Sequence, residues 1–151
     1  MKRLFVIFVT LLLSETVVAQ ETSNDFGMQF NHVALSVSDL DASVNFYKNV
    51  LKLQEITNRT EKEGIRWFSL GQGKELHLIS VIPGEISLNK AVHFALSAPK
   101  FDAFIANLNA RNIKYSSWAG ENKKITIRAD GVKQVYIQDP DGYWIEINSA
   151  D

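Results

Sequence analysis

The sequence contains no cysteine among its 151 residues, which excludes disulfide bonds, thiol nucleophiles and a lipid-modified cysteine. It also lacks a basic run, and 16 Lys and Arg against 17 Asp and Glu give a formal net charge of -1. Such a surface offers nucleic acid no electrostatic attraction. We therefore expect a small-molecule partner and no nucleic acid, with stability that comes from packing or from a metal.

Several cofactor motifs are missing as well. The sequence has no Walker A motif, no dinucleotide glycine fingerprint and no G-x-S-x-G motif. The segment Gly71-Gln72-Gly73 indicates a hairpin turn rather than a phosphate cradle. No organic cofactor site is predicted, and the composition is typical of a single globular domain.

The first residues form a separate segment. Lys2 and Arg3 precede an apolar run over 4–13, and small residues at 17–19 favour cleavage before Gln20. A membrane-spanning helix needs about 20 apolar residues, so the run is too short to span. We predict a signal peptide over 1–19 and export to the periplasm or the medium without a stable membrane anchor. A retained anchor is the alternative.

Two similar phrases stand 61 residues apart: "NHVALSV" at 31–37 and "VHFALSA" at 92–98. Each begins at or next to one of only three histidines in the chain. Their overlay also matches other pairs: Ala34 with Ala95, Leu35 with Leu96, Ser36 with Ser97, Asp41 with Asp102 and Ala42 with Ala103. The pattern indicates one structural unit used twice.

The first unit is predicted to consist of a strand, a helix and three strands. Alternation in "FNHVALSV" is typical of a strand, and a helical stripe follows in "SDLDASVNFYKNVL". Ser38 with Asp41 resembles a shortened capping box at the helix start. Strands are expected at 54–57, 65–70 and 75–82.

The second unit repeats this order. After a strand in "AVHFALS", Pro99 stands where a helix can begin, and Asn112 ends that helix. The following strands are expected at 114–118, 124–128, 132–138 and 143–148. The segment Asp139-Pro140-Asp141-Gly142 predicts a turn before the last one. Calcium binding by its two aspartates is the alternative, but local backbone hydrogen bonds account for both residues.

Strand alternation predicts that the histidines lie on the face of each sheet that points away from the helices. His32 and His93 alternate with larger apolar residues that pack under the helices. Near the ends of the units "LHLIS" at 76–80 aligns with "IEINS" at 145–149, so His77 corresponds to Glu146. Both are expected on the same open face as the other two histidines.

Three imidazoles and a carboxylate are ligands for divalent Zn, Ni, Mn or Fe. The alternative, that each His is an ordinary hydrogen-bonded residue, explains one histidine better than four ligand-type residues at matched positions. A buried Glu146 would also need a cation or a proton. We predict a metal site formed by His32, His77, His93 and Glu146.

The paired units, "NHVALSVSDLDASVNFYKNVLKLQ" and "VYIQDPDGYWIEI" together resemble the vicinal oxygen chelate superfamily, which includes glyoxalase I, bleomycin and fosfomycin resistance proteins and extradiol dioxygenases. The resemblance covers 27–149 and implies an α+β fold of two βαβββ modules, at 27–83 and 90–149, that form an open barrel around a metal. It implies the same four ligands. Glyoxalase I enzymes usually have Glu or Gln where this chain has His77, which argues against that activity.

Among the ligands only Glu146 is a candidate catalytic base, because a metal-bound imidazole is a poor proton acceptor. Trp144 is predicted to share the open face and wall a substrate pocket. Weaker candidates for the pocket are Tyr136, Trp118, Trp67 and Arg66.

Three functions remain open. The first is an exported metal-dependent lyase or isomerase that stabilises an enolate or similar oxyanion. The second is a drug- or metabolite-sequestering protein of the bleomycin-resistance type, and the third is an Fe(II) dioxygenase. One module supplies only two ligands, so the modules must face each other, either within one chain or across a two-fold homodimer, which we expect.

Overall fold

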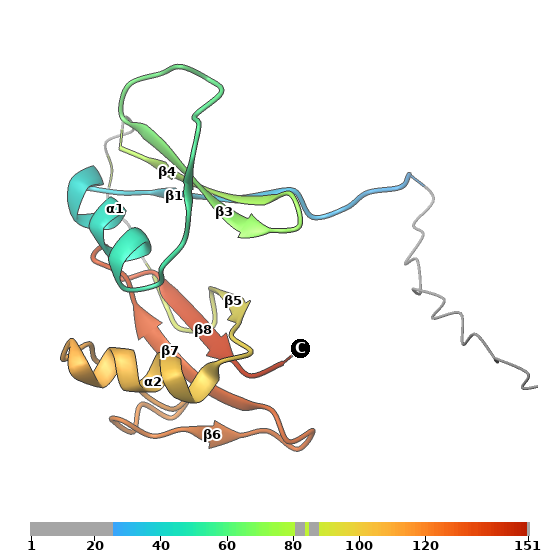
Figure 1. Ribbon diagram of the computed structural model, residues 1–151, viewed down its shortest axis with the longest axis vertical. Helices are drawn as coiled ribbons and strands as arrows, with labels where there is room; N and C mark the ends of the chain where they lie inside the picture. Colours follow the sequence, from blue (N-terminus) through green and yellow to red (C-terminus); the bar gives the residue numbers. More distant parts are fainter. Residues whose placement is uncertain (1–25, 81–83, 85–87, 151) are drawn as a thin grey trace, which may run out of the picture.

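The same order of elements occurs twice in the computed structural model, which describes residues 26–80, 84 and 88–150 (Figure 1). The predicted signal segment 1–19 lies outside the described residues. The first half consists of β1 (His32–Ser36), α1 (Leu40–Asn49), β2 (Glu55–Ile56), β3 (Ile65–Gly71) and β4 (Lys74–Ile79). The second consists of β5 (His93–Ser97), α2 (Phe101–Ala110), β6 (Thr126–Ile127), β7 (Lys133–Gln138) and β8 (Trp144–Asn148).

Each half forms its own four-stranded sheet, with the orders β1-β4-β3-β2 and β5-β8-β7-β6. The first strand of each half runs parallel to the last, and the other pairs are antiparallel. Figure 1 shows the first sheet in the upper part of the molecule and the second sheet below it. The predicted α+β class with two βαβββ units is confirmed.

The helix starts differ from the prediction. At α1 the cap is Asp39, whose side chain accepts a hydrogen bond from the Ala42 amide at 3.0 Å. Ser38 is not the cap, because its amide and hydroxyl both donate to Asp141. Pro99 also lies outside α2, whose N-cap is Lys100.

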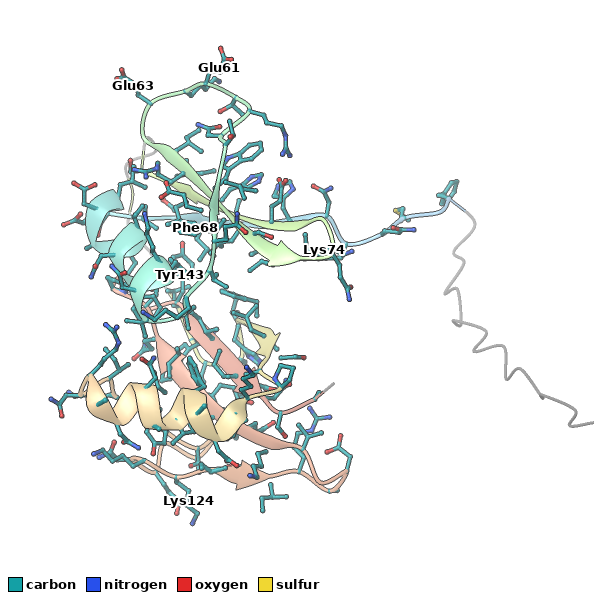
Figure 2. All side chains as sticks on the ribbon, in the orientation of Figure 1. Glu61, Glu63, Phe68, Lys74, Lys124 and Tyr143 are labelled. Atoms are coloured by element: carbon teal, nitrogen blue, oxygen red, sulfur yellow. The ribbon has the colours of Figure 1, made fainter. Side chains whose placement is uncertain are left out.

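The core lies between the helices and the helix-facing sides of the two sheets. Alternate strand residues such as Leu35, Leu76 and Ile145 are buried in one apolar cluster with residues from both helices. Figure 2 shows Phe68 and Tyr143 in the interior, while Glu61 and Lys124 project at the periphery. Because every second strand residue enters this cluster, the intervening residues, the predicted ligands among them, lie on the opposite faces.

Contacts through the D-P-D-G turn join the two halves. Tyr47 on α1 donates a buried hydrogen bond of 2.8 Å to Asp139. Asp141 accepts from Ser38, through its amide and its hydroxyl, and from the Ser43 hydroxyl. Asp139 also binds the amides of Asp141 and Tyr143, which confirms the local turn bonds expected of it. Asp141, in contrast, reaches across to the start of α1.

One predicted strand is absent. Residues 114–118 form only isolated bridges at Ser116, to Asn122 and Tyr136. The chain turns back at once, because the Gly120 amide binds the Ser117 carbonyl and Lys123 adopts a positive φ of 55°. The strand expected at 124–128 is accordingly reduced to β6. No helix in the described part of the chain is long and apolar enough to cross a membrane.

Candidate metal centre

Two predicted ligands meet on the second sheet. Nε2 of His93 on β5 lies 3.6 Å from Oε2 of Glu146 on β8. The other ring nitrogen, Nδ1, is 2.9 Å from the Lys90 carbonyl oxygen. Because a carbonyl only accepts hydrogen bonds, Nδ1 is the nitrogen that donates, and Nε2 is the nitrogen that faces Glu146.

Both oxygens of Glu146 are held by neighbouring side chains. Tyr136 on β7 donates its hydroxyl proton to Oε2 at 2.6 Å, and Asn148 donates to Oε1 at 2.9 Å. Burial, reinforced by the bond to Glu146, raises the pKa of Tyr136 well above its usual value, so the phenol stays a donor. Glu146 is 7 % exposed. Its orientation is therefore set before any ligand arrives.

Trp144, the predicted pocket residue, borders a lysine that the sequence reading did not single out. Nζ of Lys90 lies 4.6 Å from the Trp144 ring centre, 4.8 Å from that of Tyr136 and 5.9 Å from that of Trp118. It donates to the carbonyls of Ser117 and Trp118 at 2.5 and 3.1 Å. Burial lowers the pKa of Lys90. No local motif marks this lysine, because its partners lie at least 26 residues away.

A cleft of about 480 Å³ opens beside these aromatic residues. Tyr136 and Trp144 line it together with segments 112–116 and 138–140. The rings of Trp118 and Tyr136 lie 6.1 and 5.4 Å from that of His93. Neither His93 nor Glu146 lines the cleft, so the pocket role of the three aromatic residues stays a prediction. Arg66 does not join them, since it forms an ion pair with Glu55 in the first half.

The other two predicted ligands meet on the first sheet. The rings of His32 on β1 and His77 on β4 stack with centres 4.3 Å apart. His77 is covered on its other side by Trp67, at 4.0 Å and nearly parallel. Arg59 lies over the outer side of Trp67, and Nε2 of His77 is 3.0 Å from Oε2 of Glu75.

The structure therefore forms two pairs, His32 with His77 and His93 with Glu146. Within the residues described here, no group of three or more His, Asp or Glu side chains is close enough to hold a metal ion. The four-ligand site is not assembled inside one chain and stays a prediction.

The second pair nevertheless fits a metal. Two ligand atoms about 2.1 Å from a tetrahedral zinc ion lie roughly 3.4 Å apart, close to the observed 3.6 Å. The pair also has the outer hydrogen bonds common at metal sites, one to the second nitrogen of the imidazole and two to the carboxylate.

A model of the Glyoxalase/Bleomycin resistance protein/Dioxygenase superfamily matches residues 29–147. The chain belongs to this superfamily. The resemblance predicted from the repeat is thus confirmed.

Two relatives are identical to this chain at little more than a quarter of the aligned positions. A metallothiol transferase, FosB, of Staphylococcus saprophyticus is 27% identical over 126 residues, covering 80% of this chain and 76% of that protein. The protein YwbC of Bacillus subtilis is 28% identical over 124 residues, covering 78% of this chain and 94% of that protein.

Solved structures show the same fold. The oxidase ChaP-H2 has a TM-score of 0.67 at 22% identity and covers 82% of this chain and 94% of its own. A lactoylglutathione lyase from Agrobacterium tumefaciens has a TM-score of 0.59 at 22% identity, with coverage of 80% and 92%.

Proposed function

We propose that this protein is an exported metal-dependent enzyme that acts on a small substrate with two neighbouring oxygen atoms, in a lyase- or isomerase-type reaction. The observation that carries the proposal is the His93–Glu146 pair, with its ligand atoms 3.6 Å apart and its outer hydrogen bonds in place. The kinship with a metallothiol transferase, which is metal-dependent by its name, supports this proposal.

A divalent Zn, Ni, Mn or Fe ion held by this pair, with histidine from the first-half sheet, would supply Lewis-acid stabilisation of an enolate or similar oxyanion. The protein residues have separate tasks. Tyr136 and Asn148 hold the carboxylate of Glu146, and the Lys90 carbonyl holds His93. Glu146 accepts the substrate proton in our proposal, which requires one of its oxygens to turn towards the substrate. Trp144 lines the cleft and would wall the substrate pocket.

In our proposal a second chain completes the site. Each half offers one pair on its own sheet, and the cited contacts between the halves run from Tyr47 and Ser43 of α1 to Asp139 and Asp141 in the turn between β7 and β8. The ligand-bearing strands β1 and β5 both lie at the ends of their sheets. We propose a homodimer in which β1 of one subunit lies along β5 of the other. His32 and His77 of one subunit then join His93 and Glu146 of its partner.

A dioxygenase is the second candidate function. Two histidines and one carboxylate form the donor set that non-haem Fe(II) oxygenases use, with the remaining positions open. His93 and Glu146 with one histidine of the first half match that set.

A sequestering protein of the bleomycin-resistance type is the third. The three aromatic rings of Trp118, Tyr136 and Trp144 favour it, because they provide an apolar surface for a flat ligand.

Metal analysis of protein purified without chelators separates the three functions. Zinc, nickel or manganese at one equivalent per site supports the lyase or isomerase, and iron supports the dioxygenase. A protein without metal, whose content equals that of His93→Ala, would contradict both enzymes and leave the sequestering function.

Export is tested separately by intact mass. We expect a mature chain that begins at or near Gln20. A protein that retains Met1 after secretion would contradict the signal peptide.

A further inference from the structure

Lys90 stands just before β5 and is bound at both its backbone and its side chain. Its carbonyl oxygen accepts a hydrogen bond from Nδ1 of His93 at 2.9 Å. The turn that contains it is fixed by Asn89, whose side chain and carbonyl accept from the amides of Ala91 and Val92, each at 3.0 Å. The side chain of Lys90 therefore starts from a set position next to one member of the candidate metal pair.

The ammonium group of Lys90 has three acceptors in a segment that lies far along the chain. Nζ is 2.5 Å from the Ser117 carbonyl, 3.1 Å from the Trp118 carbonyl and 3.2 Å from the Ser116 hydroxyl. An ammonium has three N–H donors and no acceptor, so these oxygens account for all of its donors. A neutral amine has only two N–H bonds, and the arrangement thus fits the charged form of the lysine.

Three aromatic rings surround the same ammonium. Nζ lies over Trp144, Tyr136 and Trp118, at 4.6, 4.8 and 5.9 Å from the ring centres. The faces of such rings attract a cation, and Trp attracts it most strongly. Trp118 and Tyr136 also contact each other edge to face, with ring centres 5.4 Å apart. The charge of Lys90 thus holds together rings that come from β7, from β8 and from the segment before β6.

The segment 116–122 carries Trp118, and its attachment to the sheet is narrow. At its base Ser116 exchanges two backbone hydrogen bonds of 2.9 Å with Tyr136. After that point the segment forms a tight loop with internal hydrogen bonds rather than a strand. The Trp118 side chain is half exposed, at 50%. The bonds from Lys90 therefore tie the carbonyl groups of this loop to the start of β5.

Trp118 in turn lies beside His93. The two ring centres are 6.1 Å apart at an angle of 60°, and Tyr136 meets the imidazole edge to face at 5.4 Å. The side chain of His93 is 24% exposed and that of Glu146 is 10% exposed. Lys90 therefore contacts the His93 ring through its carbonyl and holds the neighbouring indole through its ammonium.

We propose that Lys90 is a positioning residue for the His93–Glu146 pair. Its ammonium holds the segment 116–122 closed, so that the indole of Trp118 covers the His93 ring. Solvent and small chelators then reach His93 only when the segment opens. The closed position of the segment follows from contacts within this chain, whereas its effect on a bound metal rests on the proposed function.

Fluorine NMR of the metal-free, full-length protein labelled with fluorotryptophan tests the closed position. Lys90→Met keeps the backbone carbonyl and a side chain of similar length but removes the ammonium. We expect the resonances of Trp118 and Trp144 to move, while that of Trp67 in the first half stays in place. Lys123→Met, at an exposed position next to the segment, is the matched control and should leave all the resonances unchanged. An unchanged Trp118 resonance in Lys90→Met would overturn the proposal.

Chemical rescue separates the charge of the side chain from its shape. Lys90→Ala removes three carbons and the ammonium, which propylammonium supplies as one molecule. Propylammonium should return the Trp118 resonance to its wild-type position. Propanol at the same concentration and sodium chloride at the same ionic strength should not. Equal rescue by propanol would show that packing rather than charge holds the segment, which also contradicts the proposal.

A measurement on the wild type does not depend on the folding of any variant. The three rings around Nζ should shift the ε-methylene protons of Lys90 upfield of those of the exposed lysines, in proton NMR of protein with labelled lysine. Protons of Lys90 at the position of an exposed lysine would rule out the closed arrangement.

Zinc release to an excess of chelator measures the consequence for the site. Lys90→Met retains the candidate ligands, and zinc should leave it about tenfold faster than the wild type, comparable to the loss that changes in outer residues cause at metal sites. Equal rates in the two proteins would overturn the role at the metal pair. A wild type that binds no zinc would instead overturn the proposed function, and the fluorine spectra would still decide the position of Trp118.

Discussion

The two halves of the molecule share a backbone plan but support their predicted ligands by different means. Trp67 on β3 pairs with His77 on β4, and at the matching place Tyr136 on β7 pairs with Glu146 on β8. In the first half the aromatic residue stacks on its neighbour, and in the second half it donates a hydrogen bond.

This difference shows how one repeated unit serves two tasks. A carboxylate needs donors to be oriented, and a phenol and an amide provide them in the second half. An imidazole stack needs flat surfaces, and an indole provides one in the first half. In the described residues neither half brings three possible ligands together by itself. Each half instead holds one pair of candidate ligands, the first by stacking and the second by hydrogen bonds.

The largest expected effect comes from removing one ligand from either half. His32→Ala and Glu146→Ala should each weaken metal binding by at least about 100-fold, more than changes to outer residues usually do. If the halves of two chains combine, mixing the two variants under subunit exchange should restore one intact site per heterodimer. Metal titration of the mixture measures this, and a sedimenting monomer with a full equivalent of metal would contradict the shared site.

The next effect concerns the junction between the halves. Asp141→Ala removes the acceptor of Ser38 and of the fully buried Ser43, so the free energy of unfolding should fall by about 1–3 kcal/mol. Urea unfolding measures the loss as a lower midpoint with an unchanged slope. The control is Asp102→Ala, whose exposed ion pair with Lys133 should be worth less than about 1 kcal/mol. Equal losses in the two variants would mean that Asp141 does not join the halves.

A smaller effect on metal binding should distinguish Tyr136 from Trp67, the aromatic residues at matching positions in the two halves. Tyr136→Phe keeps the ring but removes the donor to Glu146, and we expect metal binding about tenfold weaker. Trp67→Phe at the matching position keeps a stacking surface and should stay within about threefold. Chelator competition on both variants measures the difference. The comparison between the halves fails if the two substitutions have the same effect.

The smallest effect is a change in pH dependence in the first half. Burial and the bond to Asp139 raise the pKa of Tyr47 above its usual value. The unfolded chain therefore loses this proton near pH 10 while the folded chain keeps it, so stability falls as pH rises above about 10. Tyr47→Phe should reduce that fall by up to about 1.4 kcal/mol per pH unit, in urea unfolding between about pH 10 and 11. Identical slopes would contradict the assignment.

Much of the fold could be predicted from the spacing of apolar residues and from the repeat of 61 residues in the sequence. The strand predicted at 65–70 is observed as β3 over Ile65–Gly71, and 143–148 as β8 over Trp144–Asn148. These strands alternate strongly and end at turns. The segment 114–118 has similar composition but no strand partner along its length, because the chain reverses at Gly120. Strand formation there depends on tertiary contacts that local pattern does not contain.

The two pairs of candidate ligands could be predicted from the sequence, but the groups that hold their side chains could not. Alternation alone places His32 and His77 on one face, and His93 and Glu146 on another. The hydrogen-bond partners of the histidines were not predictable. Asn31 and Glu75 stand within two residues of His32 and His77, but no sequence motif marks them as partners. Lys90 binds His93 through its backbone carbonyl. A carbonyl group is present at every residue, so no residue type marks one that orients a histidine.

The bonds between Ser38 and Asp141 also affect the order of events during synthesis. These residues are 103 positions apart, so at about 5–20 residues per second the ribosome needs roughly 5–20 s to add the second after the first. Throughout that interval the emerging chain has the start of α1 without the carboxylate that binds it. The first half therefore reaches its final stability only after Asp141 has left the ribosome.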